Sequence, residues 1–360
     1  MNLRAAPYRK TLETLEIYWE LVRVIVPVAV LTRLLQDLGV IRAISPIFEP
    51  IMALIGLPPE LALAWLTGLL VGLWGGVISV FALTPVSALT TADMTVFSAL
   101  VLVAHAIPIE QRIIQRAGPG FLITAALRGF GAFAFAVLLH QTFSATGWLR
   151  TPLQPSWTPM DQSSDWRAFF TDTVWTLLTM LIVLLVLSWL IELLKALGLM
   201  ARLNKGLAPF FRLTGIDAST VPFASVGLFL GISYGGGLLI RESRTASTDP
   251  RQIFLACVFM GFAHSVIEDT LVVATLGANF ASIFFGRLVF ATLTTALIAK
   301  LIYSISDNVL YRAFFHRFNW RPKSLLGSNE LIRSSTPYVC SRHKGGHSNV
   351  RLCVLSRHRG

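Results

Sequence analysis

The sequence predicts an all-α, polytopic integral membrane protein, and three observations support this fold class. Hydrophobic residues make up 54% of the 360 residues and charged residues only 14%, against roughly a quarter charged in soluble domains. The mean hydropathy is +0.66, which leaves too little polar surface to cover water-soluble cores of this size. Apolar runs recur without a heptad or Gly-X-Y period, which excludes a disordered, coiled-coil or collagen-like chain.

An internal duplication organises these apolar runs. At one offset of 159 residues, and without a gap, the second half of the chain repeats glycines, a proline, a histidine and an arginine of the first half. The matched pairs include Gly39 with Gly198, Pro50 with Pro209, Gly72 with Gly231, Gly76 with Gly235, His105 with His264, Gly118 with Gly277 and Arg128 with Arg287. Such residues rarely coincide at one offset by chance, so we predict two tandem homologous repeats.

Each repeat is expected to contain the same five segments in the same order. These are an apolar helix (17–38; 174–197), a short amphipathic segment (44–57; 203–216), a glycine-rich helix (61–82; 220–240), a third apolar stretch (94–107; 253–267) and a last helix (120–140; 279–303). Crossing about 30 Å of hydrocarbon takes roughly 20 apolar residues. The first, glycine-rich and last segments are therefore predicted to span the membrane, whereas the third ends short at a polar motif.

The predicted domain organisation follows from these segments. It consists of an N-terminal cytoplasmic flank (1–14), a first membrane repeat (15–142), an inter-repeat linker rich in Pro and Trp (143–172), a second membrane repeat (173–303) and a basic tail that is expected to be disordered (304–360). Trp residues in the linker suit a membrane–water boundary.

The net charge of +11 is concentrated in the tail. Residues 312–360 contain ten Lys or Arg and a single acid, Glu330, so they carry nine of the eleven net charges. A basic tail of this kind marks a cytoplasmic flank, and no nucleic-acid partner is expected. The N-terminal flank is also basic, so we place both termini in the cytoplasm of a bacterial inner membrane and expect inverted repeats. Because the basic cluster at 241–251 fits this topology less well, a parallel arrangement stays open.

Glycines four residues apart mark the glycine-rich helix of each repeat. Gly68, Gly72 and Gly76 lie on one helical face, and small residues let helices approach closely in lipid. The run from Gly231 through Gly235 to Gly237 contains more glycine than packing requires, which favours a re-entrant or broken helix whose amides face a solute. Both interpretations stay open, and Gly231 and Gly235 are candidate substrate-binding residues.

A histidine followed five positions later by an acid ends the third stretch of each repeat. The pairs are His105 with Glu110 and His264 with Asp269. In the second repeat Glu268 also lies four residues after the histidine, on the same helical face. Ionisable residues inside a membrane are costly, so they usually line a cavity or pair with one another.

Arg128 and Arg287 occupy equivalent positions in the last helix of each repeat, deep enough to need a partner. Glu110 and Asp269 are the natural candidates. Alternatively, the acids are solvated caps at the interface and the arginines snorkel towards water. The full set of predicted substrate-binding residues is His105, Glu110, Arg128, Gly231, Gly235, His264, Glu268, Asp269 and Arg287.

Motifs for enzymatic chemistry are missing from the sequence. It contains no Gly-x-Ser-x-Gly, no His-Glu-x-x-His, and no Walker or dinucleotide fingerprint. We therefore predict no enzyme, no catalytic residue and no cofactor. The pair of His264 and Glu268 is by itself weak support for a metal site, and the Cys and His residues of the tail match no zinc-finger spacing. No metal site is assigned.

The chain resembles the nucleoside recognition, or Gate, family of bacterial membrane proteins. Related proteins include the gate regions of ferrous-iron transport protein B and of concentrative nucleoside transporters, and the spore-maturation proteins A and B. The resemblance depends on the segment 209–215, the glycine stretch 227–237 and the run His264-Ser265-Val-Ile-Glu268-Asp269-Thr270, with their counterparts in the first half. The first copy of that run departs from the pattern, since it reads His105-Ala-Ile-Pro108-Ile-Glu110.

The polar clusters and this resemblance lead to one functional expectation. We predict a transporter, or a gate protein, for a small polar solute that is nucleoside-like or an ion, with a cavity between the two repeats. The histidines would donate hydrogen bonds to the solute or titrate, since ordinary histidine changes charge near pH 6.5. The alternative is a non-transporting membrane protein that assembles with or regulates a partner. The expected partners are the lipid bilayer, the solute and either a second copy or another membrane protein.

Overall fold

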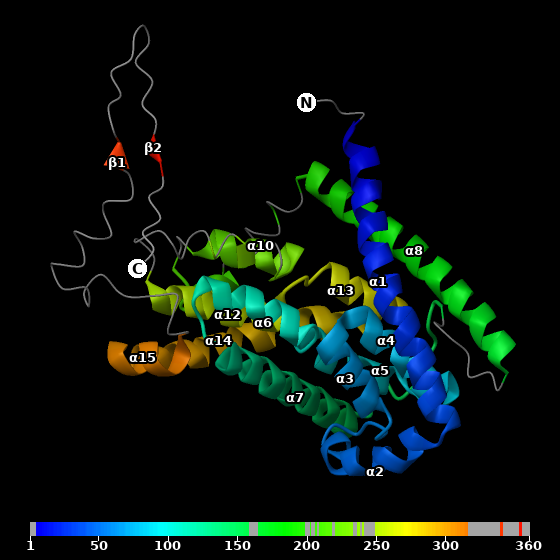
Figure 1. The fold of residues 1–360 in the computed structure, drawn as a ribbon. Helices are drawn as coiled ribbons and strands as arrows, with labels where there is room; N and C mark the ends of the chain where they lie inside the picture. The colour runs from blue at the N-terminus through cyan, green and yellow to red at the C-terminus, as the bar shows by residue number, and fades with distance from the viewer. Residues whose placement is uncertain are drawn as a thin grey trace, which may run out of the picture. The chain divides into compact units, whose positions relative to one another are not determined.

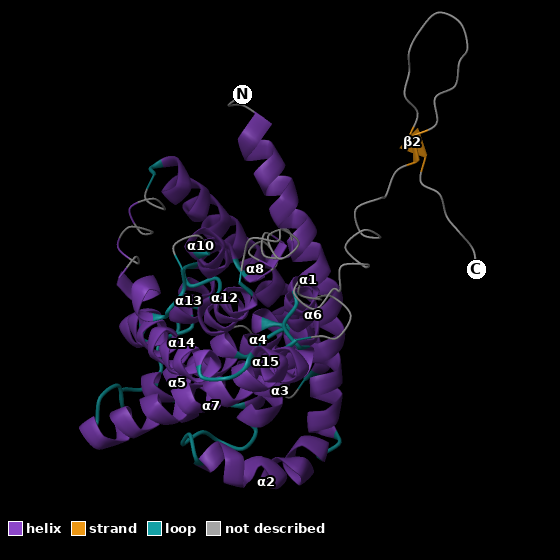
Figure 2. Ribbon diagram, turned by 90° about the vertical axis from the view of Figure 1, so that its left-hand side faces the viewer, coloured by secondary structure: helices purple, strands orange, loops and turns teal. Residues whose placement is uncertain are grey.

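The computed structural model describes residues 5–157, 165–198, 209–217, 220–232 and 249–315, a few residues between 202 and 240, and residues 339–340 and 353–354. The chain divides into two units, 1–316 and 317–360. Helices form almost all of the described ordered structure of the first unit (Figure 2). In the second unit β1 (Val339–Cys340) pairs with β2 (Cys353–Val354) in an antiparallel ladder.

The helices of the first half follow the predicted order. They are α1 (Ala5–Asp37), α2 (Val40–Ala53), α3 (Leu61–Val71), α4 (Leu73–Leu83), the 3-10 turn η1 (Val86–Ala88), α5 (Thr91–Val103), α6 (Ile107–Ala117) and α7 (Phe121–Thr146). The second half contains α8 (Trp166–Ala196), α10 (Val221–Leu230), α12 (Pro250–Ala263), α13 (Glu268–Thr275), the π-helical turn η2 (Ser282–Gly286), α14 (Arg287–Tyr303) and α15 (Asp307–Phe314).

The first helices of the two repeats lie side by side and run in opposite directions (Figure 1). Near the start of α1, the Thr14 hydroxyl donates to Ser188 Oγ near the end of α8, at 2.9 Å. At the other end, the guanidinium of Arg33 lies over the ring of Trp166, which begins α8, at 5.9 Å from the ring centroid. An antiparallel arrangement of equivalent helices is the one expected for inverted repeats.

The glycine-rich segment of the first repeat is broken, and it does not form the single spanning helix expected over 61–82. Gly72 has φ +133°, a conformation that ends α3 and starts α4. The chain then folds back, because a Cβ added to Gly76 would lie 3.0 Å from the Cα of Gly68 and 3.4 Å from the carbonyl oxygen of Ala64. The equivalent Gly231 ends α10 with φ +88°. Glycine therefore serves both close packing and a helix break.

Five helical stretches of the described residues are long and apolar enough to cross a membrane. They are Thr91–Ala117, Phe121–Thr146, Trp166–Leu190, Pro250–Thr275 and Ser282–Tyr303. The expectation that the third stretch of each repeat ends short is therefore wrong. This stretch continues past its polar motif into α6 in the first repeat and into α13 in the second. Neither α1 nor the broken glycine-rich segments are among the five.

The third stretches form the centre of the first unit. Nearly all of α5 and α12 is buried; α5 packs against α7, and α12 packs against α7 and α14. The outer helices instead expose large apolar side chains, such as Leu122 and Phe130 of α7, which are 80% and 79% exposed. Such a surface suits lipid rather than water.

Residues just after the second repeat are ordered, although they belong to the segment expected to be a disordered tail from residue 304. Helix α15 buries Leu310 against the core, and Phe315 pairs in a bridge with Pro119. Arg251 forms an ion pair with Asp307 at 2.6 Å. The amphipathic sequence of α15 explains the difference, because its apolar residues fall on one face.

Candidate functional site

Both predicted histidines lie directly after a buried helix, at equivalent breaks in the backbone. His105 follows α5 and His264 follows α12. The next residues, Ala106 and Ser265, adopt left-handed conformations with φ +46° and +45°, which non-glycine residues rarely do. Each break turns the chain so that the histidine stays at the end of one helix while its acid lies in the next.

The broken glycine-rich segments hold these breaks in place. The amide of Ala106 donates to the carbonyl oxygen of Gly68 at 3.0 Å, and the amide of Ser265 donates to that of Gly227 at 3.4 Å. Gly231 leaves no room for a side chain, since an added Cβ would lie 2.7 Å from Ser265 Oγ. The predicted site residue Gly231 thus positions the histidine loop. Gly235 lies outside the described residues.

The two imidazole rings meet at the centre of the protein. Their Nε2 atoms are 3.2 Å apart, and the ring centroids are 4.8 Å apart. His105 is 6% exposed and His264 only 1%. The equivalent histidines of the two repeats therefore meet at one buried point.

Equivalent backbone contacts orient the two rings. His105 Nδ1 lies 3.0 Å from the carbonyl oxygen of Val101, and His264 Nδ1 lies 3.0 Å from that of Met260. A carbonyl oxygen only accepts hydrogen bonds, so each Nδ1 is the protonated nitrogen. In the neutral form of each ring, Nε2 then carries the lone pair.

Arg128 is buried and tied to the first histidine loop. Its Nη1 donates to Glu110 Oε2 at 2.6 Å, its Nε donates to the carbonyl oxygen of Val103 at 2.8 Å, and its Nη2 donates to that of His105 at 3.1 Å. The pairing of Arg128 with Glu110 agrees with the sequence prediction. The second carboxylate oxygen, Glu110 Oε1, lies 3.5 Å from His264 Nε2 and 3.8 Å from His105 Nε2.

The second repeat places its arginine in the same way, but one oxygen of its acid has no hydrogen-bond partner. Arg287 Nη2 donates to the carbonyl oxygen of His264, just as Arg128 bonds that of His105. Its Nε and Nη1 atoms are buried without a hydrogen-bond partner, and so is Asp269 Oδ2. That oxygen lies 3.8 Å from His105 Nε2, so the acid of the second repeat faces the histidine of the first.

Glu268 occupies the first turn of α13 and is partly exposed. It is not part of the group of closely spaced ligand atoms, which consists of His105, His264 and Asp269, with one atom from each within 4.8 Å of the others. The closely spaced ligand atoms therefore come from both repeats. The pair of His264 and Glu268, which the sequence places on one helical face, is not part of this group.

Sequence reasoning missed two buried polar residues beside the acids. Gln111 is 1% exposed and Thr270 is fully buried, and their side-chain polar atoms have no hydrogen-bond partner. They follow Glu110 and Asp269 directly and match each other at the 159-residue offset. Their equivalence at that offset was the signal in the sequence that could have identified them. Buried polar side chains normally have hydrogen-bond partners, so the lack of partners at both positions sets them apart.

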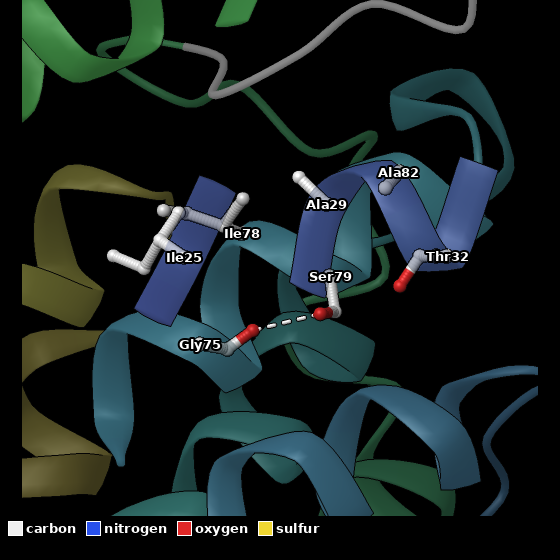
Figure 3. A pocket seen from close by; sticks show the side chains of 7 residues that line it. All are labelled: Ile25, Ala29, Thr32, Gly75, Ile78, Ser79 and Ala82. Carbon is white, nitrogen blue, oxygen red and sulfur yellow. Dashed lines mark hydrogen bonds between the residues drawn. The ribbon is translucent and has the colours of Figure 1, made fainter. Parts of the chain in front are cut away.

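A small cavity between α1 and α4 lies away from the predicted residues (Figure 3). Ile25 and Ala29 of α1 face Gly75, Ile78 and Ser79 of α4, and the Ser79 hydroxyl donates to the carbonyl oxygen of Gly75 at 2.8 Å. Its volume is about 10 Å³, which is room for about one water molecule. None of the predicted site residues lines it.

The fold and the buried cluster define a class: a multi-pass membrane protein built from two helical repeats that meet at a polar centre. The family model described as Gate, nucleoside recognition, matches residues 18–120 and 177–280. These two matches begin at the 159-residue offset of the duplication and cover more than half of the chain, so the protein belongs to the Gate family.

A curated relative covers most of the chain. The uncharacterized membrane protein YvoD of Bacillus subtilis (strain 168) is 26% identical over 289 residues, which represent 78% of this chain and 90% of that protein. No solved structure is similar to this chain at a significant level.

Proposed function

We propose that the protein is a transporter, or a membrane-embedded gate, for a small polar solute. The observation that carries this proposal is the contact between the two histidines, which brings the polar clusters of both repeats to one buried point. Ionisable side chains inside a membrane are expensive and are usually retained where a polar substrate must pass. The Gate family's description as nucleoside recognition supports a nucleoside-like solute, and the chemistry of the cluster supports an ion.

The relationship between the repeats suggests how such a site would open. Two inverted repeats that meet at a central site can expose it to either side of the membrane by rocking against each other. The helix breaks at Gly72 and Gly231 contact the histidine loops, so movement of either glycine-rich segment would change access to the histidines. Arg128 and Arg287 would hold both loops in register during that movement.

We further propose a bacterial inner membrane, with both termini in the cytoplasm and an external linker. The basic flanks and the antiparallel packing of α1 and α8 support this topology. Reporter fusions after residue 14 and after residue 316 should both report a cytoplasmic location. An external signal from one of them would contradict inverted repeats with an odd number of crossings each.

Solute flux into proteoliposomes tests the proposal. Nucleosides, bases and divalent cations form the panel, and any solute that enters faster than into empty liposomes is then tested with variants. His264→Ala and Asp269→Ala should reduce that flux to the background. His140→Ala, which removes a histidine of α7 that is not in the cluster, should retain it.

Two results would reject this function. Unchanged flux in both His264→Ala and Asp269→Ala would remove the cluster from the mechanism. Absence of flux for every solute, together with a protein that co-purifies in fixed ratio, would favour the non-transporting partner protein.

A further inference from the structure

We propose that His105, His264 and Asp269, with Glu110, form a binding site for one divalent transition-metal ion. The proposal starts from the lone pairs at the centre of the protein. Both Nδ1 atoms face backbone carbonyl oxygens at 3.0 Å, so in the neutral rings two Nε2 lone pairs face each other at 3.2 Å. Two lone pairs at this distance repel each other unless a cation or a proton lies between them.

The spacing of the donor atoms fits a metal coordination sphere. Metal–nitrogen bonds of about 2.0–2.1 Å in a tetrahedral site separate neighbouring ligand atoms by roughly 3.3–3.4 Å. The two Nε2 atoms are 3.2 Å apart. Glu110 Oε1 lies 3.5 Å from His264 Nε2 and 3.8 Å from His105 Nε2, and Asp269 Oδ2 lies 3.8 Å from His105 Nε2. One ligand atom from each of His105, His264 and Asp269 lies within 4.8 Å of the others, so small side-chain movements would bring these three to one ion. Glu110 Oε1 is then the fourth ligand.

A proton alone would satisfy fewer of these groups. A proton shared between the histidines would join their Nε2 atoms, but Asp269 Oδ2, at 3.8 Å from His105 Nε2, is too far away for a hydrogen bond. That oxygen is buried and has no hydrogen-bond partner. A divalent ion would satisfy both histidines and this oxygen together.

The surroundings of the ligands resemble those of metal sites. A metal-bound histidine almost always donates its other ring N–H to a carbonyl or carboxylate, which fixes the ring; here both histidines do so. Glu110 keeps one oxygen on Arg128 and points the other at the histidines. Arg128 therefore anchors this ligand, and its charge is already offset by a carboxylate and two carbonyl oxygens.

The donor set also selects the class of ion. Imidazole nitrogen suits zinc, iron, cobalt, nickel and copper, whereas magnesium and calcium prefer sites made of oxygen. Two nitrogens and two carboxylates therefore favour a first-row transition metal such as Zn²⁺. That this ion is the transported solute rests on the proposed function; that it binds does not.

Cobalt binding to the purified full-length protein tests the site, because Co²⁺ replaces zinc and its absorption reports tetrahedral coordination. Cys340→Ser and Cys353→Ser form the common background, since tail thiolates also bind metals. In this background, one equivalent of Co²⁺ should give a tetrahedral spectrum and be displaced by Zn²⁺. The double variant His105→Gln/His264→Gln should lose this equivalent, whereas His140→Gln should retain it.

A second variant keeps the test decisive if the double variant does not fold. Asp269→Asn preserves shape and should weaken Co²⁺ binding at least about tenfold, the lower limit seen when even an outer-sphere partner is lost. Unchanged affinity in Asp269→Asn, or no tetrahedral spectrum in the background protein, would overturn the metal site. Zn²⁺ binding without flux of any solute would support the metal site and reject transport. Flux of a non-metal solute through a protein that binds no metal would support transport and reject the metal site.

Discussion

His105 Nε2 and His264 Nε2 lie 3.2 Å apart, although 159 residues separate them in the chain. Each belongs to a different repeat, each is fixed by a carbonyl oxygen four residues earlier, and each loop is held by an arginine at the same offset. The duplication therefore produces one symmetric pair of histidines at the interface of the repeats. The two acids break this symmetry, because Glu110 is bonded to Arg128 whereas Asp269 Oδ2 has no hydrogen-bond partner.

Arg128 should contribute strongly to stability, because it is 2% exposed and its removal leaves Glu110 buried without a counter-charge. Arg128→Met is expected to lower the free energy of unfolding by about 3–5 kcal/mol. The measurement is denaturant unfolding in mixed micelles. Arg112→Met is the control, because Arg112 is exposed on α6, where it donates to Gln115 and lies over the ring of Phe121; it should cost less than about 1 kcal/mol. Equal losses in the two variants would contradict the role of Arg128.

Two glycines of α7 provide a matched test of the packing between repeats. A Cβ at Gly131 would lie 2.4 Å from Phe262 Cε1, two residues before His264, whereas a Cβ at Gly129 would meet nothing within 4 Å. Gly131→Ala should therefore destabilise the protein by about 1–3 kcal/mol through overpacking. Gly129→Ala should be neutral or stabilising by up to about 1 kcal/mol, because alanine favours a helix. Thermal unfolding distinguishes the variants, and the reverse order would show that α7 does not pack on α12 as described.

The raised pKa of Tyr311, which lies just after the second repeat, predicts that the stability of the folded protein depends on pH in the alkaline range. Burial, and then the nearby carboxylate of Asp307, raises the pKa of this phenol to about 12. The folded protein therefore keeps a proton that the unfolded chain loses above about pH 10. The stability that this difference in pKa contributes should be fully present below about pH 10 and lost as the pH rises towards about 12.

Comparison with Tyr311→Phe isolates this effect. The melting temperature of the wild-type protein should fall more steeply than that of the variant between about pH 10 and pH 12. Parallel curves would mean that the phenol titrates normally and that α15 does not shield it.

The sequence predicted equivalence between positions better than contact between them. The offset of 159 residues correctly paired the helix-breaking glycines and the two arginines, and the buried charge of Arg128 correctly required Glu110. It did not predict that His105 meets His264, because periodicity within each repeat contains no information on how the repeats pack. It also did not reveal the fold-back at Gly72, since a glycine every four residues suits a straight packed helix equally well.

Breaks in the central helices were difficult to predict for a related reason. Pro108 is the residue of this segment that most disfavours a continuous helix, yet the chain departs from the helix earlier, at Ala106. There the Ala106 amide donates to Gly68, and Arg128 donates to the preceding carbonyl oxygen. Such a contact between distant segments overrides local propensity. The same packing directs Asp269 Oδ2, which has no hydrogen-bond partner, towards the histidine of the other repeat.

The most direct measurement is the anomalous X-ray density of crystals grown with Zn²⁺, collected on both sides of the zinc absorption edge. We predict one strong peak between the two repeats, about 2.0–2.1 Å from both Nε2 atoms and adjacent to Asp269. A zinc peak found solely at the tail cysteines, or two imidazole rings that are separated with no density between them, would contradict the account.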